Sequence, residues 1–213
     1  MKNSIQLLID RIIAGSEHLT LGINDEKGLE VGFMRPLTTD HLDQPELIQK
    51  LTDWRNQNMG NFLTHFLATP ERTRNWMKNV LFKTPGQMLL MIYVNDQVVG
   101  HFGFKDLAKD DVLLDNAMRG DRLGHPKLMV FAGMALVEWL FRETGVQRIH
   151  AYVMADNVAS IMMNKQIGFN GWSRHPLISV VKDNETQWKI GAEGTDSPDA
   201  RYCFNLVLDR NSQ

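Results

Sequence analysis

The chain has 213 residues, of which 43% are hydrophobic and 23% charged, and its formal net charge is −2. These values are ordinary for a globular protein and suit one well-filled domain rather than two. There is no basic excess to indicate nucleic acid binding, and no apolar stretch reaches the roughly 18 residues that span a bilayer. We therefore expect no nucleic acid partner, no membrane association and a cytoplasmic location. The single cysteine, Cys203, lies in an apolar stretch and is interpreted as a buried side chain rather than a nucleophile.

The N-terminal third combines helical patterns with strands that glycines interrupt. Apolar residues spaced three and four apart predict an amphipathic helix over 4–14, and short strands follow within 19–37. Residues 43–58 and 69–82 are each predicted to form a helix with a proline in its first turn. We assign residues 1–30 to a helical extension packed on the domain, and residues 31–213 to the domain itself.

The rest of the chain predicts a sheet with helices against it. Two apolar runs joined by Asn95-Asp96 predict a β-hairpin over 87–94 and 97–104. The other expected elements are strands at 111–118, 148–154, 171–182 and 201–208, a long buried helix at 126–143 and a short helix at 157–166. This order predicts an α/β or α+β fold with a mixed sheet.

The turn between the strand at 111–118 and the long helix carries the strongest chemical signal. It reads Arg119-Gly120-Asp121-Arg122-Leu123-Gly124 and is followed by His125 and Pro126. The first turn of a helix has unpaired N–H groups, glycines let an anion approach closely, and arginines add positive charge. The turn therefore suggests a diphosphate cradle, although spacing alone favours the alternative, a solvated loop with a helix cap. It matches neither a Walker loop nor a Rossmann fingerprint.

Three segments resemble motifs of the GNAT acetyltransferase family. The turn at 119–124 resembles motif A, an Arg/Gln-x-x-Gly-x-Gly/Ala turn that holds the pyrophosphate of coenzyme A, but departs from its strict spacing. Residues 157–169 resemble motif B, commonly Asn-x-x-Ala/Ser-Ile-x-x-Tyr-x-x-x-Gly-Phe. Arg35-Pro36-Leu37 and Trp54-Arg55-Asn56 look like the amino-terminal part of ribosomal-protein and nucleotide-aminosugar acetyltransferases. Together the matches span about residues 31–175.

The resemblance implies a GNAT fold, with a mixed, mostly antiparallel sheet flanked by helices and splayed middle strands. It also implies transfer of an acetyl or other acyl group to an amine, with acetyl-CoA or another acyl-CoA as co-substrate. No metal is expected, since no metal-ligand spacing is present. Acyl-CoA would lie between the strands at 111–118 and 148–154. The residues expected to bind it are Ala117, Met118, Arg119, Gly120, Arg122, Leu123, Gly124, His125, Asn157 and Ser160.

Three residues are candidates for catalysis by direct attack of a neutral amine on the thioester. Asp115 and His101 are candidate bases, and their plainer interpretations are a strand-end carboxylate and a hydrogen-bonded histidine on the sheet. Asn164 stands where motif B has a tyrosine thought to protonate the departing thiolate. An amide is no general acid at neutral pH, so Asn164 is left to hydrogen-bond the thiolate or the pantetheine.

The acceptor amine has more than one interpretation. A small amine, including a nucleotide-linked amino sugar, is the first, and a protein amino-terminus or lysine is the second. A third alternative is a GNAT-fold protein that binds acyl-CoA without catalysis, which rests only on the missing tyrosine. A peptide acceptor needs an open groove, whereas a sugar nucleotide needs a pocket with a basic phosphate site. A homodimer is also considered.

Overall fold

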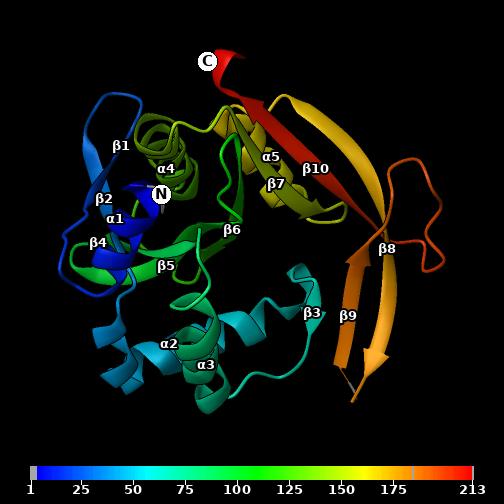
Figure 1. Ribbon diagram of the computed structural model, residues 1–213, viewed down its shortest axis with the longest axis horizontal. Coiled ribbons are helices and arrows are strands. Elements are labelled where there is room, and N and C mark those ends of the chain that lie inside the picture. The colour runs from blue at the N-terminus through cyan, green and yellow to red at the C-terminus, as the bar shows by residue number, and fades with distance from the viewer. Residues whose placement is uncertain (1–3, 184, 213) are drawn as a thin grey trace.

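The computed structural model describes residues 4–183 and 185–212, and its centre is a large twisted sheet (Figure 1). The strands are β1 (Leu21–Asn24), β2 (Glu30–Pro36), β3 (Thr64–His65), β4 (Met88–Val94), β5 (Gln97–Lys105), β6 (Asp111–Arg119), β7 (Arg148–Met154), β8 (Gly171–Lys182), β9 (Glu185–Ile190) and β10 (Tyr202–Asp209). Their spatial order is β1-β2-β4-β5-β6-β7-β10-β8-β9-β3. Every neighbouring pair is antiparallel except β6 and β7. The predicted mixed, mostly antiparallel sheet is confirmed.

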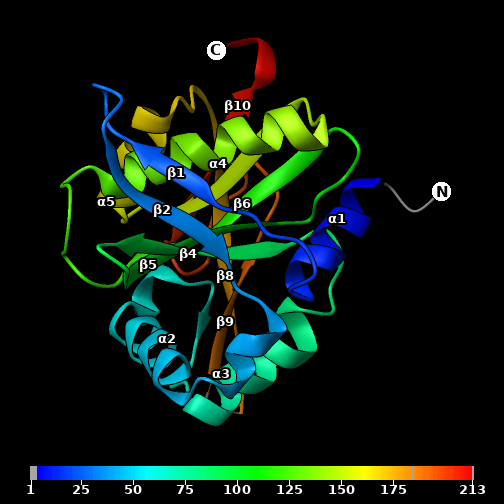
Figure 2. The same ribbon diagram turned by 90° about the vertical axis from the view of Figure 1, so that its left-hand side faces the viewer.

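Helices cover both faces of the sheet. They are α1 (Ser4–Ile13), α2 (Pro45–Gln57), α3 (Pro70–Trp76), α4 (Leu128–Thr144) and α5 (Val158–Ile167). The short turns are η1 (Thr39–Asp43), η2 (Met59–Asn61), η3 (Met77–Leu81) and η4 (Arg210–Ser212), of which η3 is π-helical. Figure 2 shows α4 on one side of the sheet and α2 and α3 on the other. Two separate apolar cores result, the larger one under α4 and the smaller one under α2.

Most local predictions are confirmed because their signals are local. Asn95 and Asp96 have φ values of 50° and 60°, as a two-residue hairpin turn between β4 and β5 requires. Asn157 caps α5 by accepting a hydrogen bond from the Ser160 amide at 3.1 Å. The helix predicted over 69–82 differs, since α3 ends at Trp76 and continues as the wider turn η3.

Strands β3 and β9 lie outside the predicted elements. β3 has two residues, which is too short for a periodic pattern, and it pairs with β9 through Thr64–Gln187 and His65–Thr186. Arg72 of α3 also forms a paired ion contact with Glu185 of β9. The end of the sheet formed by β8, β9 and β3 therefore bends toward the helices α2 and α3, as Figure 1 shows.

The N-terminal helix belongs to the same apolar core as the rest of the domain. Ile9 and Ile12 of α1 are buried in the cluster that also contains Leu136 and Leu140 of α4. β1, which lies before residue 30, pairs with β2 beyond it. The division of the chain at residue 30 stays a prediction. None of the helices in the described residues is long and apolar enough to cross a membrane.

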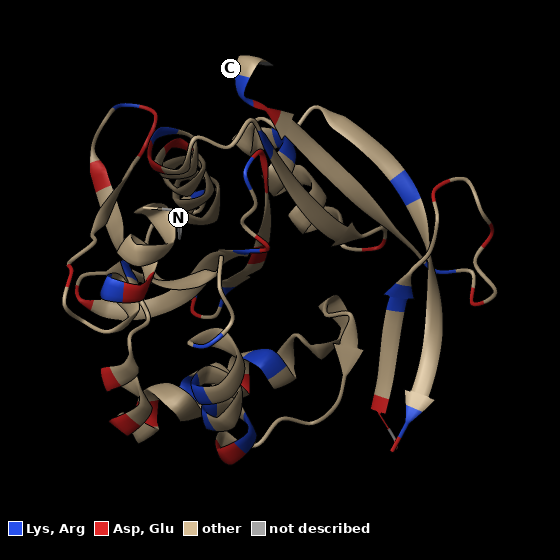
Figure 3. Cartoon of the chain, in the orientation of Figure 1, with Lys and Arg blue, Asp and Glu red and all other residues tan. Residues whose placement is uncertain are grey.

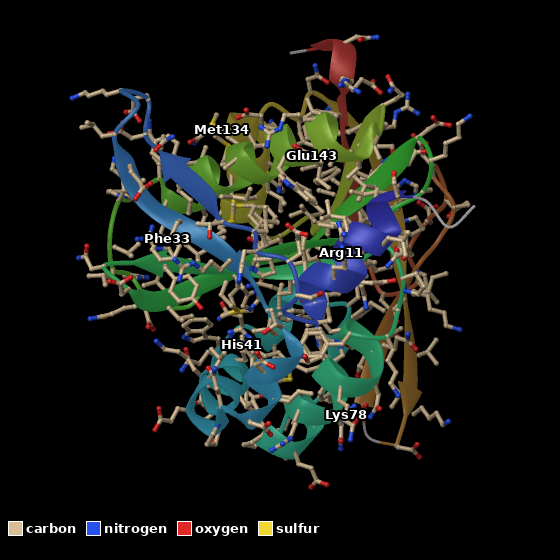
Figure 4. The ribbon with its side chains drawn as sticks, turned by 60° about the vertical axis from the view of Figure 1, so that its left-hand side comes forward. Arg11, Phe33, His41, Lys78, Met134 and Glu143 are labelled. Atoms are coloured by element: carbon tan, nitrogen blue, oxygen red, sulfur yellow. The ribbon has the colours of Figure 1, made fainter. Side chains whose placement is uncertain are left out.

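Helix α4 is held tightly between the sheet and α5. Its outer face carries the exposed Met134 and Glu143 (Figure 4), whereas Ala132 and Leu136 are fully buried. Gly133 lies at the contact with α5. A Cβ there would be 2.2 Å from Cδ1 of Ile167 and 3.0 Å from a ring carbon of Phe102. The glycine thus lets α5 and β5 approach α4 closely.

Replacing Gly133 by alanine is expected to destabilise the protein, although alanine favours helices. The added methyl group has no room beside Ile167. We expect the free energy of unfolding to fall by about 1–3 kcal/mol, measured by denaturant titration. Adding Ile167→Val, which removes the clashing Cδ1, should recover part of this loss. Gly60→Ala is the control, because a Cβ at Gly60 meets nothing within 4 Å. Unchanged stability of Gly133→Ala would contradict this account of the packing.

Candidate active site

The pairing between β6 and β7 stops halfway along the strands. It joins Asp111–Leu114 to Arg148–Ala151, yet β6 continues to Arg119 and β7 to Met154. Figure 1 shows the two strands diverging beyond this point. The facing edges at 115–119 and 152–154 have no strand partner, since β5 and β10 lie on the opposite sides of β6 and β7. The structure thus contains the predicted splayed strands, with their apex at Asp115.

A β-bulge in β6 lies at this apex. Gly103 of β5 is opposite Asp115 and His101 is opposite Met118, so β6 has one residue more than β5 over this stretch. Asn116, in the bulge, has φ 53°. The His101 Nδ1–H donates to the Asn116 carbonyl oxygen at 2.6 Å.

His101 holds the bulge as a neutral imidazole. Its side chain is buried and lies close to Trp54 of α2, with ring centroids 6.2 Å apart. Burial lowers the pKa of His101 to about 4, against the opposite effects of the Asn116 carbonyl and the Asp115 carboxylate. With its one proton on Nδ1, the ring is fixed in a single tautomer. The interpretation of His101 as a hydrogen-bonded histidine on the sheet agrees with these contacts.

Asp115 presents one free carboxylate oxygen at the apex. Its Oδ2 accepts a hydrogen bond from Asn116 Nδ2 at 2.8 Å and lies 3.1 Å from Lys105 Nζ. Oδ1 has no partner among the residues that the structure describes, and the side chain is 31% exposed. A proton or an ammonium group entering the gap can therefore reach this oxygen.

Arg119 organises the loop that leads from β6 to α4. Its guanidinium donates to the carbonyl oxygens of Asp121 (3.3 Å), Leu123 (2.9 Å), His125 (2.9 Å) and Pro126 (3.0 Å). The guanidinium is thus engaged within the protein, and its contact with a phosphate stays a prediction. With the carbonyls turned toward Arg119, the amides of residues 122–125 have no acceptor within 4–183 and 185–212. Such a group of free amides is suited to binding an anion.

The two glycines of the loop are required for different structural reasons. A Cβ on Gly120 would be 1.8 Å from the Trp54 ring, whose Nε1 donates to Asp121 at 3.3 Å. Trp54 therefore supports the loop from α2. Gly124 has φ 85°, and a Cβ there would be 3.0 Å from Val94. Position 124 favours glycine because φ is positive and because a larger side chain would press against Val94. The exposed Arg122 has no hydrogen-bond partner in the described chain.

Among the other residues predicted to bind the cofactor, Ala117 lies at the gap, whereas the side chains of Met118 and His125 make contacts within the protein. Ala117 is exposed in the diverging part of β6. The Met118 side chain packs in the smaller core under α2, so only its backbone faces the gap. His125 Nδ1 accepts a hydrogen bond from the Lys127 amide at 3.1 Å, next to the start of α4.

Asn164 lies on the buried side of α5 with an unsatisfied oxygen. Its Nδ2 donates to the Ser160 carbonyl at 2.8 Å, whereas the enclosed Oδ1 has no partner among the described atoms. It shares this side with Ile167, which reaches Gly133 of α4. Leaving a buried acceptor unpaired costs about 1–3 kcal/mol. Pairing this enclosed oxygen would therefore stabilise the fold by a similar amount.

Beyond the gap, three polar side chains lie in a row on one face of the sheet. Tyr152, Asn205 and Ser173 are opposite one another on β7, β10 and β8, and Tyr152 is in step with Asp115. The Ser173 hydroxyl is 2.9 Å from His175 Nε2. β7 and β10 carry Arg148 and Asp209 as their charged residues, and these two pair at 2.7 Å at one end of the strands (Figure 3). The sequence pattern did not single out this row.

Two further sequence interpretations concern cysteine and metals. Cys203 is buried, and burial raises the pKa of its thiol to about 11. It stays protonated at neutral pH, which confirms the interpretation as a buried side chain. Within the described residues, no three His, Cys, Asp or Glu side chains are grouped to hold a metal ion.

Comparisons with known proteins agree with this architecture. The family profile for the acetyltransferase (GNAT) domain matches residues 33–170. No curated protein matches the sequence.

Solved structures share the fold at low identity. A GNAT-family protein from Chromobacterium violaceum superimposes with a TM-score of 0.63 at 15% identity, over 90% of this chain and 87% of that one. A ribosomal L7/L12 alpha-N-protein acetyltransferase in complex with coenzyme A gives 0.58 at 11% identity, over 92% and 100% of the two chains. An aminoglycoside acetyltransferase in complex with coenzyme A and kanamycin gives 0.57 at 16%, over 84% and 95%. Because the family profile covers most of the sequence, the chain belongs to the GNAT acetyltransferase family and is an acyl-CoA-dependent N-acyltransferase.

Proposed function

We propose that acyl-CoA binds in the gap between β6 and β7 and that its acyl group passes directly to a small primary amine. The observation that carries this proposal is the free amides of 122–125 at one end of two unpaired strand edges. The amides suit the diphosphate, and the edges suit the amide groups of the pantetheine arm. An acyl-CoA held in this way brings its thioester to the apex, where Asp115 lies.

The residues at the apex suit nucleophilic attack by an amine. The amine nitrogen bonds to the thioester carbon, the carbon–sulfur bond breaks, and coenzyme A leaves as a thiolate. Asp115 Oδ1 is the proposed acceptor of the amine proton, because it is the carboxylate oxygen without a partner. Unpaired N–H groups of β6 beyond the bulge are placed to stabilise the negative charge on the carbonyl oxygen.

Two of the three candidate catalytic residues take supporting roles in this proposal. His101 fixes the bulge through Asn116 and is a positioning residue. Asn164 accepts a hydrogen bond from a pantetheine amide through its enclosed Oδ1. The departing thiolate takes its proton from solvent, since an amide has none to give.

The proposed acceptor is a small amine that carries no phosphate. Tyr152, Asn205 and Ser173 offer uncharged groups across three strands, about 10 Å at the usual strand spacing. Among the cations of these strands, Arg148 is paired with Asp209, and Arg174 lies over the ring of Tyr202. A sugar nucleotide would need cations for its phosphates, and this row supplies none. The contact of β3 with β9 closes the far side of the sheet, which favours a small acceptor over a protein surface.

A panel of neutral amino sugars and simple amines tests the function through thiol release from acyl-CoA. We expect acceptor-dependent release by the wild-type protein. Asp115→Asn should lower kcat by about 100-fold or more, in the range of a lost general base, while CoA affinity measured by calorimetry stays within twofold. Asp111→Asn is the matched control, because Asp111 lies on the same strand where β6 and β7 still pair. Full turnover by Asp115→Asn would exclude the carboxylate as the base.

Arg122 and Arg119 are expected to respond differently to substitution. Arg122→Gln should weaken CoA binding up to about fivefold at low salt, and salt should abolish the difference because the side chain is exposed. Arg119→Gln should weaken binding at every salt concentration, because four carbonyl contacts of the loop are lost. Arg142→Gln, at the end of α4, is the control. Identical salt dependence for both loop variants would refute this division of roles.

Stability should depend on the protonation of His101. Its folded-state pKa of about 4 lies below the ordinary 6.5, so between these values the unfolded chain binds a proton that the folded protein does not. The free energy of unfolding should therefore fall as pH drops from 6.5 to 4, by roughly 3 kcal/mol in total. His101→Gln should lack this component in denaturant titrations at pH 7 and pH 4.5. Parallel curves for the two proteins would show that His101 does not titrate in this window.

A further inference from the structure

A cavity of about 130 Å³ lies beside the apex, on the side of the sheet that α3 covers. Asp115 and Asn116 form its rim on β6, and Leu89 and Phe104 contribute from β4 and β5. Leu81 and Val80 of the turn η3 close the opposite side. The cavity therefore begins at the residues where the thioester of a bound acyl-CoA would lie. This placement rests on the proposed function.

The polar groups around the cavity are largely engaged with one another. Gln87 Nε2 donates to the carbonyls of Val80 (2.7 Å) and Leu81 (3.0 Å). Lys105 and Asn116 both contact Asp115 Oδ2. A polar guest would find few free partners beyond Asp115 Oδ1 at the rim, whereas a hydrocarbon needs none. The apolar part of the wall, formed by Val80, Leu81 and Leu89, suits an apolar guest.

The shape of the apex also restricts where an acyl chain can go. Along the strands, the gap ends where Leu114 of β6 pairs with Ala151 of β7. On the α4 side, Val112 and Leu114 are buried in the larger core. The cavity on the α3 side is the space adjoining Asp115 that remains among the described residues.

We propose that this cavity binds the acyl chain, so that the enzyme prefers an acyl group longer than acetyl. Its volume of about 130 Å³ is close to that of an engineered cavity of roughly 150 Å³ that binds benzene, which suits a butyryl-sized chain. The π-helical turn η3 sets the depth of the cavity by placing Val80 and Leu81 across it.

Calorimetric titration with coenzyme A and its acetyl, propionyl, butyryl and decanoyl thioesters tests the proposal without knowledge of the acceptor. Affinity should rise about fourfold per methylene from acetyl to butyryl, as expected for burial of a CH₂ group. Decanoyl-CoA, which exceeds the cavity, should lose this gain. Val80→Phe, at the partly exposed rim, should reduce the preference for butyryl over acetyl about tenfold and leave acetyl-CoA binding within twofold.

Val181→Phe is the matched control, because Val181 is exposed on β8 away from the cavity. It should keep the wild-type preference. Equal affinity for all the short acyl-CoAs, together with amine-dependent thiol release, would overturn the acyl cavity and leave the proposed function standing. Absence of binding to every CoA compound, including free coenzyme A, would overturn both. The wild-type chain-length series does not depend on whether any variant folds.

Discussion

The site depends on the loss of pairing between β6 and β7 after Leu114. Two parallel strands that begin in register would normally stay paired, and here the bulge at Asn116 turns β6 away at the next residue. The hydrogen bond from buried His101 to the Asn116 carbonyl holds that bulge. One backbone irregularity thereby creates two free strand edges, a reachable carboxylate and the adjoining cavity.

The loop after β6 illustrates how a positive side chain can hold the backbone of a turn that is proposed to bind an anion. Arg119 binds four carbonyl oxygens of its own loop, and the amides of 122–125 remain free. Trp54 supports the same loop against Gly120. Trp54, which the sequence analysis compares with the amino-terminal part of other family members, thus contacts the loop between β6 and α4.

The asparagine in place of the motif B tyrosine has a structural consequence. Asn164 keeps one hydrogen bond within α5 and leaves its oxygen enclosed without a partner. A non-catalytic protein was supported only by the missing tyrosine, and the role proposed for the unpartnered oxygen needs no acid. A thiolate leaves readily enough for solvent to protonate it, so the substitution is compatible with turnover.

The sequence by itself determined the elements whose signals are local. The Asn95-Asp96 turn, the Asn157 cap and the apolar helix α4 follow from backbone preferences and side-chain periodicity within a few residues. The order of these elements and two motifs were enough to indicate the fold and the class of reaction. Only the tertiary structure decided the rest. A bulge at a non-glycine residue and the pairing of β3 with β9 both depend on partners distant in sequence. Such contacts leave no periodic pattern, because they form only once the sheet has brought those partners together.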